Sequence, residues 1–428
     1  MREMKDSGIE WIGEIPKDWI VIRLKYCFSG FTNGTSDTQL SSGESFYPVT
    51  RIETISSGEI NLDKIGYVAF SKKQYLLKTG DILVSNINSI KYLGNCAIVR
   101  DGYKLYHGMN LLRIVPSDYI DNGYAYYLFK SNVLKFPMEK YCKPAINQAS
   151  VSATTIKNFF IPFPALAEQQ QIANFLDTKC SEIDATAEDI QKEISLLEDY
   201  KKSLVYNVIS KGINHSRYST ENDEVWGNLP QGWKLVDIKY LFEIVKRIAG
   251  KEGYDVLSVT QKGLKIKDIT SGDGQLADNY CGYQFVYPTD YVMNHMDLLT
   301  GWVDCSELFG VTSPDYRVFR LIDRSAHNLV YYKYVMQCCY MNKIFYSLGQ
   351  GVSNLGRWRL QTSSFNNFKI PVPPKDEQDE IADFLDSKCS EIDSLIADKK
   401  RQLDILADYK KSLIYEYVTG KKEVATQE

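Results

Sequence analysis

The sequence predicts an α/β (α+β) protein in which two globular regions of mixed α/β structure alternate with two long helices, as a pseudo-two-fold internal repeat. Residues 161–206 and 370–415 match without gaps at a constant offset of 209, the repeat offset, with 25 identities in 46 positions. The regions before them carry short apolar runs typical of strands. An ungapped match of this length indicates an internal duplication, so the two halves of the chain share one architecture.

Each repeated stretch opens with Ile-Pro-x-Pro and continues without glycine until Gly212 or Gly420, as expected for a helix that starts just after proline. Apolar residues then recur at alternating steps of four and three, which predicts a narrow seam that packs against a partner helix. At about 1.5 Å per residue, each helix would reach roughly 65 Å. Two nearly identical seams in one chain favour packing on each other; the alternative is that each helix docks only on its own domain. The predicted seam consists of Leu176, Cys180, Ile183, Ile190, Ile194, Leu197, Leu204, Leu385, Cys389, Ile392, Ile396, Leu403, Leu406 and Leu413.

The globular regions begin alike. Pro16-x-x-Trp19 recurs as Pro230-x-x-Trp233 at an offset of 214, so each half is one module that ends in its long helix. The predicted division is residues 1–160, the first globular region, and 161–212, the first helix, followed by 213–369, the second globular region, and 370–428, the second helix and tail. Residues 212–225 are polar and without periodicity, and we interpret them as a linker.

Within the globular regions the predicted elements are short and mostly strands. They lie near residues 46–52, 66–70, 81–84, 97–99 and 111–115, and near residues 255–259, 284–287 and 317–321. One helix is expected near residues 124–134, with a counterpart near 331–346. Outside the shared frame the two regions have little similarity, as expected for two binding domains with different targets.

The charge distribution permits a polyanionic partner. The net charge is −4, but the two helical stretches account for −4 and −5, so the remaining segments sum to +5. The nine cysteines lack CxxC spacing, which is typical of reduced cytoplasmic thiols. The absence of a signal peptide and of any long apolar run favours a cytoplasmic protein that makes no use of a membrane.

Motifs for catalysis are missing. The sequence contains no Gly-x-x-x-x-Gly-Lys-Ser/Thr phosphate loop and no Asn/Asp-Pro-Pro-aromatic motif of amino-methylating enzymes, and the glycines at 349, 351 and 356 have the wrong spacing for a dinucleotide loop. The four histidines are dispersed and lack metal-ligand spacing. We therefore predict no catalytic residue and no metal site on this chain.

Several segments together resemble the specificity subunit of type I restriction–modification systems. They are Asp-Ser-Gly-Ile-Glu-Trp-Ile-Gly-Glu-Ile-Pro-x-x-Trp at residues 6–19, Thr-Gly-Asp-Ile-Leu at residues 79–83, and the two copies of Ile-Pro-x-Pro followed by Glu-Gln-x-x-Ile-Ala-x-Phe-Leu-Asp at residues 161–177 and 370–386. The resemblance spans the whole chain. One departure is that the second half has Met-Asp-Leu-Leu at residues 296–299 where the first has Gly-Asp-Ile-Leu at residues 80–83.

The resemblance implies a non-catalytic reader of double-stranded DNA. Each target-recognition domain would read one half of a bipartite site, and the two spacer helices would pack antiparallel, set the distance between the half-sites and bind two modification subunits. Those subunits would bring S-adenosylmethionine to methylate adenine, and restriction subunits would add ATP- and magnesium-dependent translocation and cleavage. No cofactor is expected on this chain itself.

Candidate DNA-contacting residues are polar or basic side chains in segments that follow strands, because base edges are read by Arg, Lys, Asn and Gln and phosphates by basic and hydroxyl groups. For each of them the alternative is an ordinary solvated surface residue. In the first half they are Lys72, Lys73, Asn86, Asn88, Lys91, Tyr92, Asn147 and Gln148, with residues 85–92 expected to form a polar loop. In the second half they are Lys262, Lys265, Lys267, Asn354, Arg357 and Arg359.

Two other functions remain open. The chain could be an assembly scaffold whose domains bind only proteins, in which case loss of the arginines at 357 and 359 would leave sequence-specific DNA binding intact. It could also be an enzyme with an unrecognised site, such as a nuclease, in which case the isolated chain would cleave or methylate DNA.

Overall fold

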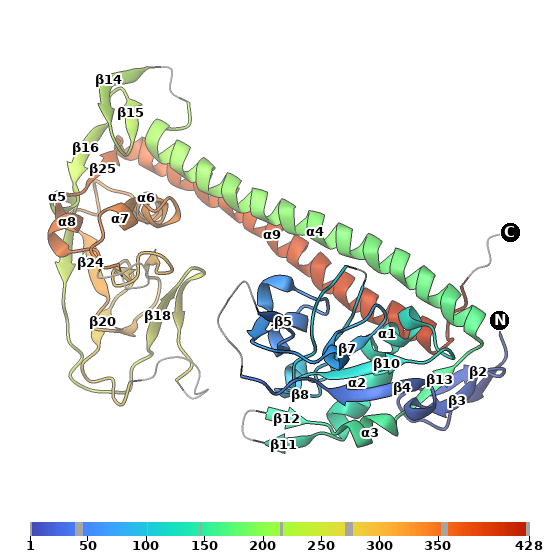
Figure 1. The fold of residues 1–428 in the computed structure, drawn as a ribbon. Coiled ribbons are helices and arrows are strands. Elements are labelled where there is room, and N and C mark those ends of the chain that lie inside the picture. Colours follow the sequence, from blue (N-terminus) through green and yellow to red (C-terminus); the bar gives the residue numbers. More distant parts are fainter. Residues whose placement is uncertain are drawn as a thin grey trace. The chain divides into compact units, whose positions relative to one another are not determined.

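The protein is represented by a computed structural model that describes residues 2–38, 46–100, 102–145, 148–214, 217–269, 277–351 and 358–424. The chain forms two compact units (Figure 1): residues 1–190 with 401–428 make the first, and residues 191–400 the second. Each unit contains one globular region and half of each long helix, so the unit boundaries cut the helices that the predicted four-segment division keeps whole. The predicted class, mixed α/β regions with two long helices, is confirmed.

The core of the first unit is a four-stranded antiparallel sheet in the order β4-β10-β7-β9. Two helices, α1 (Asn122–Lys130) and α2 (Asn132–Lys140), pack beside it and bury Tyr124, Leu128 and Phe129. The sheet strands are β4 (Phe28–Asn33), β7 (Ile82–Val84), β9 (Cys96–Ile98) and β10 (Leu112–Pro116). The other elements of this region are β1 (Met4–Asp6), β2 (Glu14–Pro16), β3 (Ile20–Arg23), β5 (Tyr47–Val49), β6 (Gly66–Val68), β8 (Ile87–Asn88), β11 (Lys143–Ala145), β12 (Gln148–Ser150), β13 (Phe160–Phe163), α3 (Ala153–Lys157) and the short 3-10 helices η1 (Leu24–Tyr26), η2 (Ile52–Ile55), η3 (Leu62–Lys64), η4 (Lys73–Tyr75) and η5 (Ile90–Tyr92).

The second unit repeats this topology. Its four-stranded antiparallel sheet has the order β17-β24-β21-β22, and α6 (Leu329–Met341), capped by the Asn328 side chain, takes the place of α1. The sheet strands are β17 (Phe242–Val245), β21 (Tyr291–Met293), β22 (Val303–Cys305) and β24 (Arg317–Leu321). The other elements are β14 (Tyr218–Asp223), β15 (Gly227–Pro230), β16 (Lys234–Asp237), β18 (Leu257–Thr260), β19 (Gly263–Ile266), β20 (Gln284–Val286), β23 (Gly310–Thr312), β25 (Lys369–Val372), α5 (Ile238–Leu241), α7 (Ile344–Ser347) and α8 (Thr362–Asn367).

Strand pairing shows that β7 and β21 are equivalent strands related by the repeat offset, whereas their neighbours β10 and β24 are related by an offset of 205. Ile82 of β7 lies opposite Ile114, and Tyr291 of β21, its counterpart at the repeat offset, lies opposite Phe319 of the equivalent strand. The segment equivalent to residues 80–83 is therefore 289–292, and the predicted match with residues 296–299 was wrong. Of the four side chains only the aspartate is shared: Asp81 accepts from the backbone N–H of Lys78 at 2.7 Å, and Asp290 accepts from that of Tyr287 at 2.9 Å.

The predicted strands all overlap observed ones, with small shifts at their ends. Each predicted helix is instead two helices, α1 with α2 and α6 with α7. Ser131 explains the first break, because it adopts an extended conformation (φ −92°, ψ 165°) and its side chain caps the start of α2.

The predicted linker is partly a hairpin. β14 lies within residues 212–225 and pairs with β15, which follows them, just as β1 pairs with β2 at the start of the first half. Trp226, 2% exposed, follows β14 and donates from Nε1 to the carbonyl of Lys369 at 2.9 Å. Polar composition misled the interpretation because β14 contributes mainly backbone pairing, while the buried apolar residues Trp226 and Leu229 come just after it.

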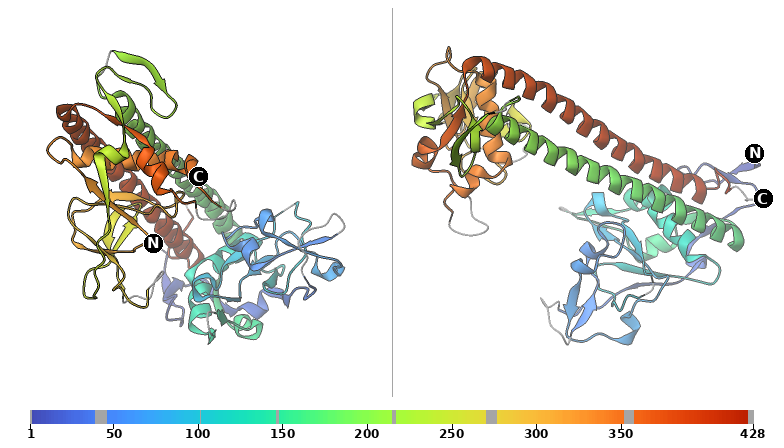
Figure 2. Two further views of the ribbon diagram at one scale, coloured as in Figure 1. Left: turned by 90° about the vertical axis from the view of Figure 1, so that its left-hand side faces the viewer. Right: turned by 90° about the horizontal axis from the view of Figure 1, so that it is seen from above.

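The long helices are α4 (Leu166–Lys211, 46 residues) and α9 (Lys375–Val418, 44 residues). As predicted, each starts just after the prolines of its Ile-Pro-x-Pro motif. They run side by side and antiparallel (Figure 2): in the first unit Phe175 packs on Tyr417 with ring centroids 4.4 Å apart, and in the second unit Lys201 contacts Asp393 at 2.6 Å. Every residue of the predicted seam is buried or half-buried. No described helix is both long and apolar enough to cross a membrane.

Three lysines interrupt the apolar seam, and each is paired with a carboxylate of the other helix; Lys399 of α9 binds Glu193 of α4 at 2.5 Å. Lys201 of α4 binds Asp393 of α9 at 2.6 Å in the second unit, and Lys410 of α9 binds Asp184 of α4 at 2.5 Å in the first unit. The pairs of Lys201 and Lys410 are related by the repeat offset. Each unit therefore has the same polar contact between α4 and α9. A leucine at that position would allow the two helices to shift along each other, whereas an ion pair fixes their register.

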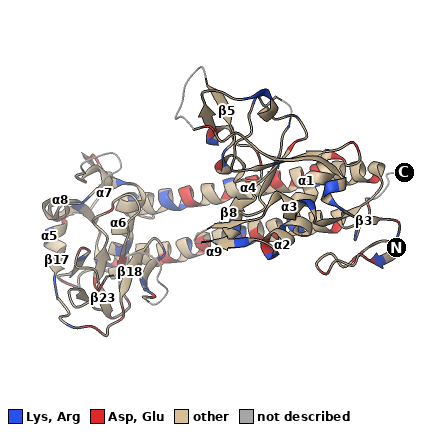
Figure 3. Ribbon diagram, turned by 60° about the horizontal axis from the view of Figure 1, so that its bottom comes forward, with Lys and Arg blue, Asp and Glu red and all other residues tan. Residues whose placement is uncertain are grey.

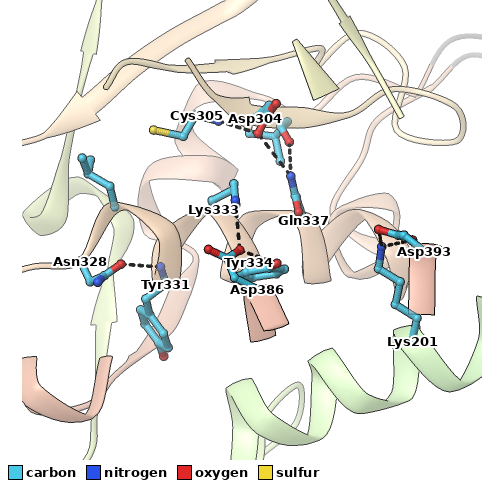
Figure 4. Close-up of polar contacts among 12 residues, drawn as sticks. Lys201, Asp304, Cys305, Asn328, Tyr331, Lys333, Tyr334, Gln337, Asp386 and Asp393 are labelled. Atoms are coloured by element: carbon cyan, nitrogen blue, oxygen red, sulfur yellow. Dashed lines mark hydrogen bonds and ion pairs between the residues drawn. The ribbon is translucent and has the colours of Figure 1, made fainter. Parts of the chain in front are cut away.

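Repeated residues attach each globular region to its own helices. Gln169, fully buried, accepts from the backbone N–H of Asp121 and donates to the carbonyl of Pro164, and Gln378 makes the same two contacts with Asn328 and Pro373. The hydroxyl of Tyr127 donates to Asp177 at 2.8 Å, as that of Tyr334 donates to Asp386 at 2.7 Å (Figure 4). These contacts explain why the frame around each region is repeated.

Candidate nucleic-acid interface

The segment after β7 was predicted as a polar loop, but it forms β8 and η5. Asn86, which precedes β8, is only 5% exposed and donates from Nδ2 to the carbonyl of Val151 at 3.0 Å. Asn88 is half-buried and donates from Nδ2 to the hydroxyl of Ser85 at 3.1 Å. Asn86 therefore lies beneath the surface, whereas Lys91 and Tyr92 at the end of the segment are exposed, with the ammonium 5.4 Å from the ring centroid.

A three-stranded sheet brings two separate predicted segments of the first region together. β12 lies between β11 and β8, and Ala149 is opposite Asn88. Gln148, exposed at the start of β12, is thus placed on the strand next to Asn88. Asn147 lies outside the described residues. The sheet gathers amide side chains from segments that are distant in the sequence, and the Lys91–Tyr92 pair follows on the next turn after β8.

The predicted Lys72 and Lys73 lie on another element. Both are exposed at the start of η4, and the carbonyl of Tyr75 at the end of η4 accepts from the backbone N–H of His107 at 2.8 Å. Lys72 and Lys73 therefore lie in the part of the fold that contains His107. Nothing in the described pairing connects them with β8 or β12.

In the second region the predicted lysines lie on the β18–β19 hairpin. Lys262 is at its turn, Lys265 is exposed opposite Ser258, and Lys267 follows β19. Lys267 lines a cavity of about 410 Å³ together with Asn294 and Met296. Lys262 faces a different and larger cavity of about 1000 Å³, beside α4 and α9 of the same unit.

Arg359 adjoins the smaller cavity. Its backbone exchanges two hydrogen bonds with Gln350 (3.0 and 3.1 Å), and its Nε lies 2.7 Å from the Sδ atom of Met296. Met296 and Lys267 line the same cavity. The structure therefore brings the predicted residues Arg359 and Lys267, from distant segments, to the same cavity. Asn354 and Arg357 lie outside the described residues.

The two candidate surfaces are built on the same backbone framework. Val151 donates to the carbonyl of Asn86 at 2.9 Å, and Leu360, the counterpart of Val151 at the repeat offset, donates to the carbonyl of His295 at 3.0 Å. Both side chains that follow the core strand keep a buried polar atom without a described hydrogen-bond partner, Asn86 Oδ1 and His295 Nδ1. Equivalent positions therefore carry different hydrogen-bonding groups on one scaffold.

His295 was not among the predicted residues. Burial, together with the nearby Arg317 and Arg359, lowers the pKa of His295 to about 4, so the ring is neutral at pH 7. A neutral imidazole both donates and accepts hydrogen bonds. The signal that identifies it is its position at the repeat offset from Asn86, which becomes meaningful only when the core strands are known to be equivalent.

Charged residues of both signs occur along the long helices and on the globular regions (Figure 3). No group of three or more His, Cys, Asp or Glu side chains that could hold a metal ion occurs in the described parts of the chain. The described chemistry of the candidate surface is thus that of hydrogen bonding and positive charge, carried by Asn, Gln, His, Lys and Arg.

Comparison with known proteins assigns the family. The sequence profile described as "Type I restriction modification DNA specificity domain" matches residues 16–196 and 230–404, one match per half of the chain. A Methanocaldococcus jannaschii protein provisionally named the type I restriction enzyme MjaX specificity subunit is 30% identical over 432 residues, covering 97% of this chain and 96% of the relative. The MjaVIII specificity subunit of the same organism is 25% identical, covering 96% and 94%.

A solved structure shares the fold. A chain from a structural study of complex assembly and conformational transition in the type I R-M system superposes with a TM-score of 0.68 at 14% identity, covering 95% of this chain and 99% of that one. The duplicated profile match, the full-length relative and the shared fold agree with one another. The chain therefore belongs to the type I restriction–modification specificity subunits, the family whose members recognise the DNA target.

Proposed function

We propose that each globular region of this specificity subunit reads one half of a bipartite DNA site, while α4 and α9 set the gap between the half-sites. The observation that carries the proposal is the pairing of one backbone framework with two sets of side chains. Val151 and Leu360 make equivalent backbone contacts in the two halves, yet the side chains that they position beside the core strand are Asn86 and His295. A shared scaffold with different polar groups is what two different half-sites require.

For the first region, the proposed reading surface is the sheet of β8, β11 and β12. Asn88 and Gln148 are amides suited to adenine, and Lys91 with Tyr92 supplies a positive charge and a stacking face. For the second region, it is the rim of the 410 Å³ cavity with Lys267 and Arg359. Arginine binds the guanine edge in a bidentate manner, so the second half-site is expected to contain guanine.

The same long helices are proposed to dock two modification subunits. Exposed apolar residues recur at the repeat offset: Leu196 and Tyr200 are 68% and 57% exposed, and Ile405 and Tyr409 are 61% and 51% exposed. Packing within the chain does not require them to be alike. The helical stretches are also acidic, so their face disfavours DNA and suits a protein with an apolar patch and a basic rim. Because the two helices present equivalent exposed faces, two copies of the same partner are expected to bind.

In this proposal the cofactors belong to the partners. The modification subunits would bind S-adenosylmethionine and methylate adenine, and restriction subunits would use ATP and magnesium. The chain's own part is to place DNA relative to them. A cytoplasmic location, where the DNA and the partners are, fits the nine free cysteines of the structure.

The test is methylome sequencing of the native host with and without the gene for this chain. Loss of adenine methylation at one bipartite motif is the expected result, and it would supply both half-sites and their gap. Methylation that is unchanged while the modification subunits are expressed would overturn the proposal. If the purified complex then bound DNA without sequence preference, the chain would act as an assembly scaffold instead.

A further inference from the structure

Among its described residues, the second globular region contains a buried positive charge without a carboxylate partner. Arg317, at the start of β24, is 4% exposed, and none of the ion pairs among the described residues involves it. Its guanidinium stacks on Phe365 at 4.5 Å. Burial lowers the pKa of Arg317 to about 10, so the group stays charged at pH 7. A buried charge that is not neutralised is costly, and it persists where something else depends on it.

The fold itself does not require this charge. Arg317 lies opposite Met293 of β21, and the equivalent position in the first region, opposite Val84 of β7, is Leu112. Leu112 is fully buried. The same sheet is therefore built with leucine at this position in one half of the chain and with arginine in the other, so the reason for the arginine belongs to the second region alone.

The hydrogen bonds of Arg317 show what it holds. Its Nη2 donates to the carbonyl of Leu360 at 3.1 Å and to the hydroxyl of Thr362 at 3.3 Å. The segment that contains Leu360 makes further backbone hydrogen bonds. The N–H of Leu360 donates to the carbonyl of His295, and the carbonyl of Trp358 accepts from the N–H of Leu298. Arg359, between them, pairs with Gln350. Arg317 thus anchors, from inside the domain, the short segment that carries Arg359 to the surface.

We infer that Arg317 is a positioning residue for recognition of the second half-site. This inference rests on the proposed reading of DNA by Arg359. It fixes the segment next to Arg359 through two acceptors at once, which a planar guanidinium can do and leucine cannot. Arg359 then approaches the DNA in one fixed geometry. This matters because a bidentate contact to a base tolerates little displacement.

The experiment uses the full-length chain in its complex with the modification subunits, and measures methylation of DNA libraries degenerate at either half-site. R359A identifies which half-site the second region reads. R317L, which copies the first region, is expected to lose about tenfold in discrimination at that half-site, the size of one good base contact. Discrimination at the other half-site should be unchanged and serves as an internal reference.

A matched control lies on the same strand. Arg320 is half-buried and pairs with Glu243, so R320L makes the same chemical change without touching the segment around Arg359. It should leave discrimination at both half-sites intact. If R317L does not fold, T362V removes one acceptor and R317K keeps the charge but loses the planar fork, and each should relax the second half-site partially.

Three outcomes decide the inference. Full discrimination by R317L, or an equal loss at both half-sites, would show that Arg317 has only a structural role or none. A wild-type complex that methylates no bipartite motif would overturn the proposed function, and the inference with it. Relaxation confined to the second half-site, with a wild-type motif present, supports both.

Discussion

The turn before the core strand shows how two halves with one backbone can differ at a single residue. Gly80 has φ +90°, and Thr289, at the same place in the second region, has φ +77°. Glycine occupies the left-handed region freely, whereas a β-branched residue is strained there. The hydroxyl of Thr289 is also buried without a described partner. The second region therefore carries a local cost that the first avoids.

Replacing Thr289 with glycine is expected to raise stability by about 1 kcal/mol, because relief of the left-handed strain outweighs the greater freedom of glycine in the unfolded chain. Thermal unfolding followed by calorimetry would show the second unit melting at a higher temperature. The reciprocal change, Gly80→Thr, should destabilise the first unit, since a Cβ there would meet Asn122 Nδ2 at 2.2 Å. An unchanged or lower melting temperature for T289G would contradict the interpretation of strain.

A buried histidine makes the first region sensitive to acid. His107 is fully buried, its Nε2 lies 2.9 Å from the carbonyl oxygen of Leu111, and burial lowers its pKa to about 4. The unfolded chain binds the proton near pH 6.5 and the folded chain only near 4, so stability falls as the pH drops from about 6.5 to 4 and then levels off for this group. Its contribution to that loss is about 3 kcal/mol.

The measurement is chemical denaturation of H107Q and of the unchanged chain at several pH values between 4 and 8. The glutamine variant is expected to start less stable at pH 8 but to lose less stability toward pH 4, which reduces the slope in the interval from 6.5 to 4. Parallel curves for the two proteins would mean that other groups account for the acid sensitivity.

At the scale of elements, the exposed repeat on the long helices yields a stoichiometric prediction. Y200A and Y409A should each weaken binding of one modification subunit, and the double variant should lose both, because each tyrosine lies on one of the two equal faces. Native mass spectrometry of the complexes would count the subunits. Large aromatic residues at such sites typically contribute about 2 kcal/mol or more to binding.

The matched control is another exposed helix position that the repeat does not preserve. Glu188 is exposed and its counterpart at the repeat offset is Ala397, so E188A should leave both subunits bound. If Y200A/Y409A complexes kept two subunits with full affinity, the partner would have to use another surface of the chain.

Elements also show where sequence patterns stopped being informative. The heptad steps predicted α4 and α9 well, because periodicity sustained along an entire long helix has few alternative explanations. The helix expected near residues 124–134 divides at Ser131, where a local side-chain cap competes with continuation, and the supposed linker contains β14, whose partner β15 supplies the backbone bonds. Both outcomes depend on contacts that periodicity does not encode.

At the scale of the whole molecule, the spacer helices make a prediction about DNA. Insertion of one heptad into both helices, between Ile190 and Gln191 and between Lys400 and Arg401 where the compact units divide, lengthens each helix by about 10 Å. The preferred gap should then grow by roughly one to three base pairs, limited by the rotation of the half-sites about the DNA axis. Methylome sequencing of the host carrying the variant reads the new gap.

A heptad inserted into α4 alone is the control. With α9 unchanged, the pairs Lys201–Asp393 and Lys410–Asp184 could not both stay in register, so this variant should abolish methylation rather than shift the gap. An unchanged gap in the double insertion would show that the helices do not measure the distance between the half-sites.

The sequence by itself determined the duplicated architecture, the two long helices with their seam, and the membership of the family, because identity at a constant offset and regular periodicity are properties of the chain alone. Only the tertiary structure decided that β7 and β21 are equivalent, that Asn86 is buried, and that Gln148 lies on the strand next to Asn88. It likewise decided that Arg359 contacts Met296, which lines the same cavity as Lys267. It also revealed Arg317, whose partners are a carbonyl and a hydroxyl far along the chain. Strand pairing and burial bring together residues that are distant along the chain, and no local pattern records which of them will meet.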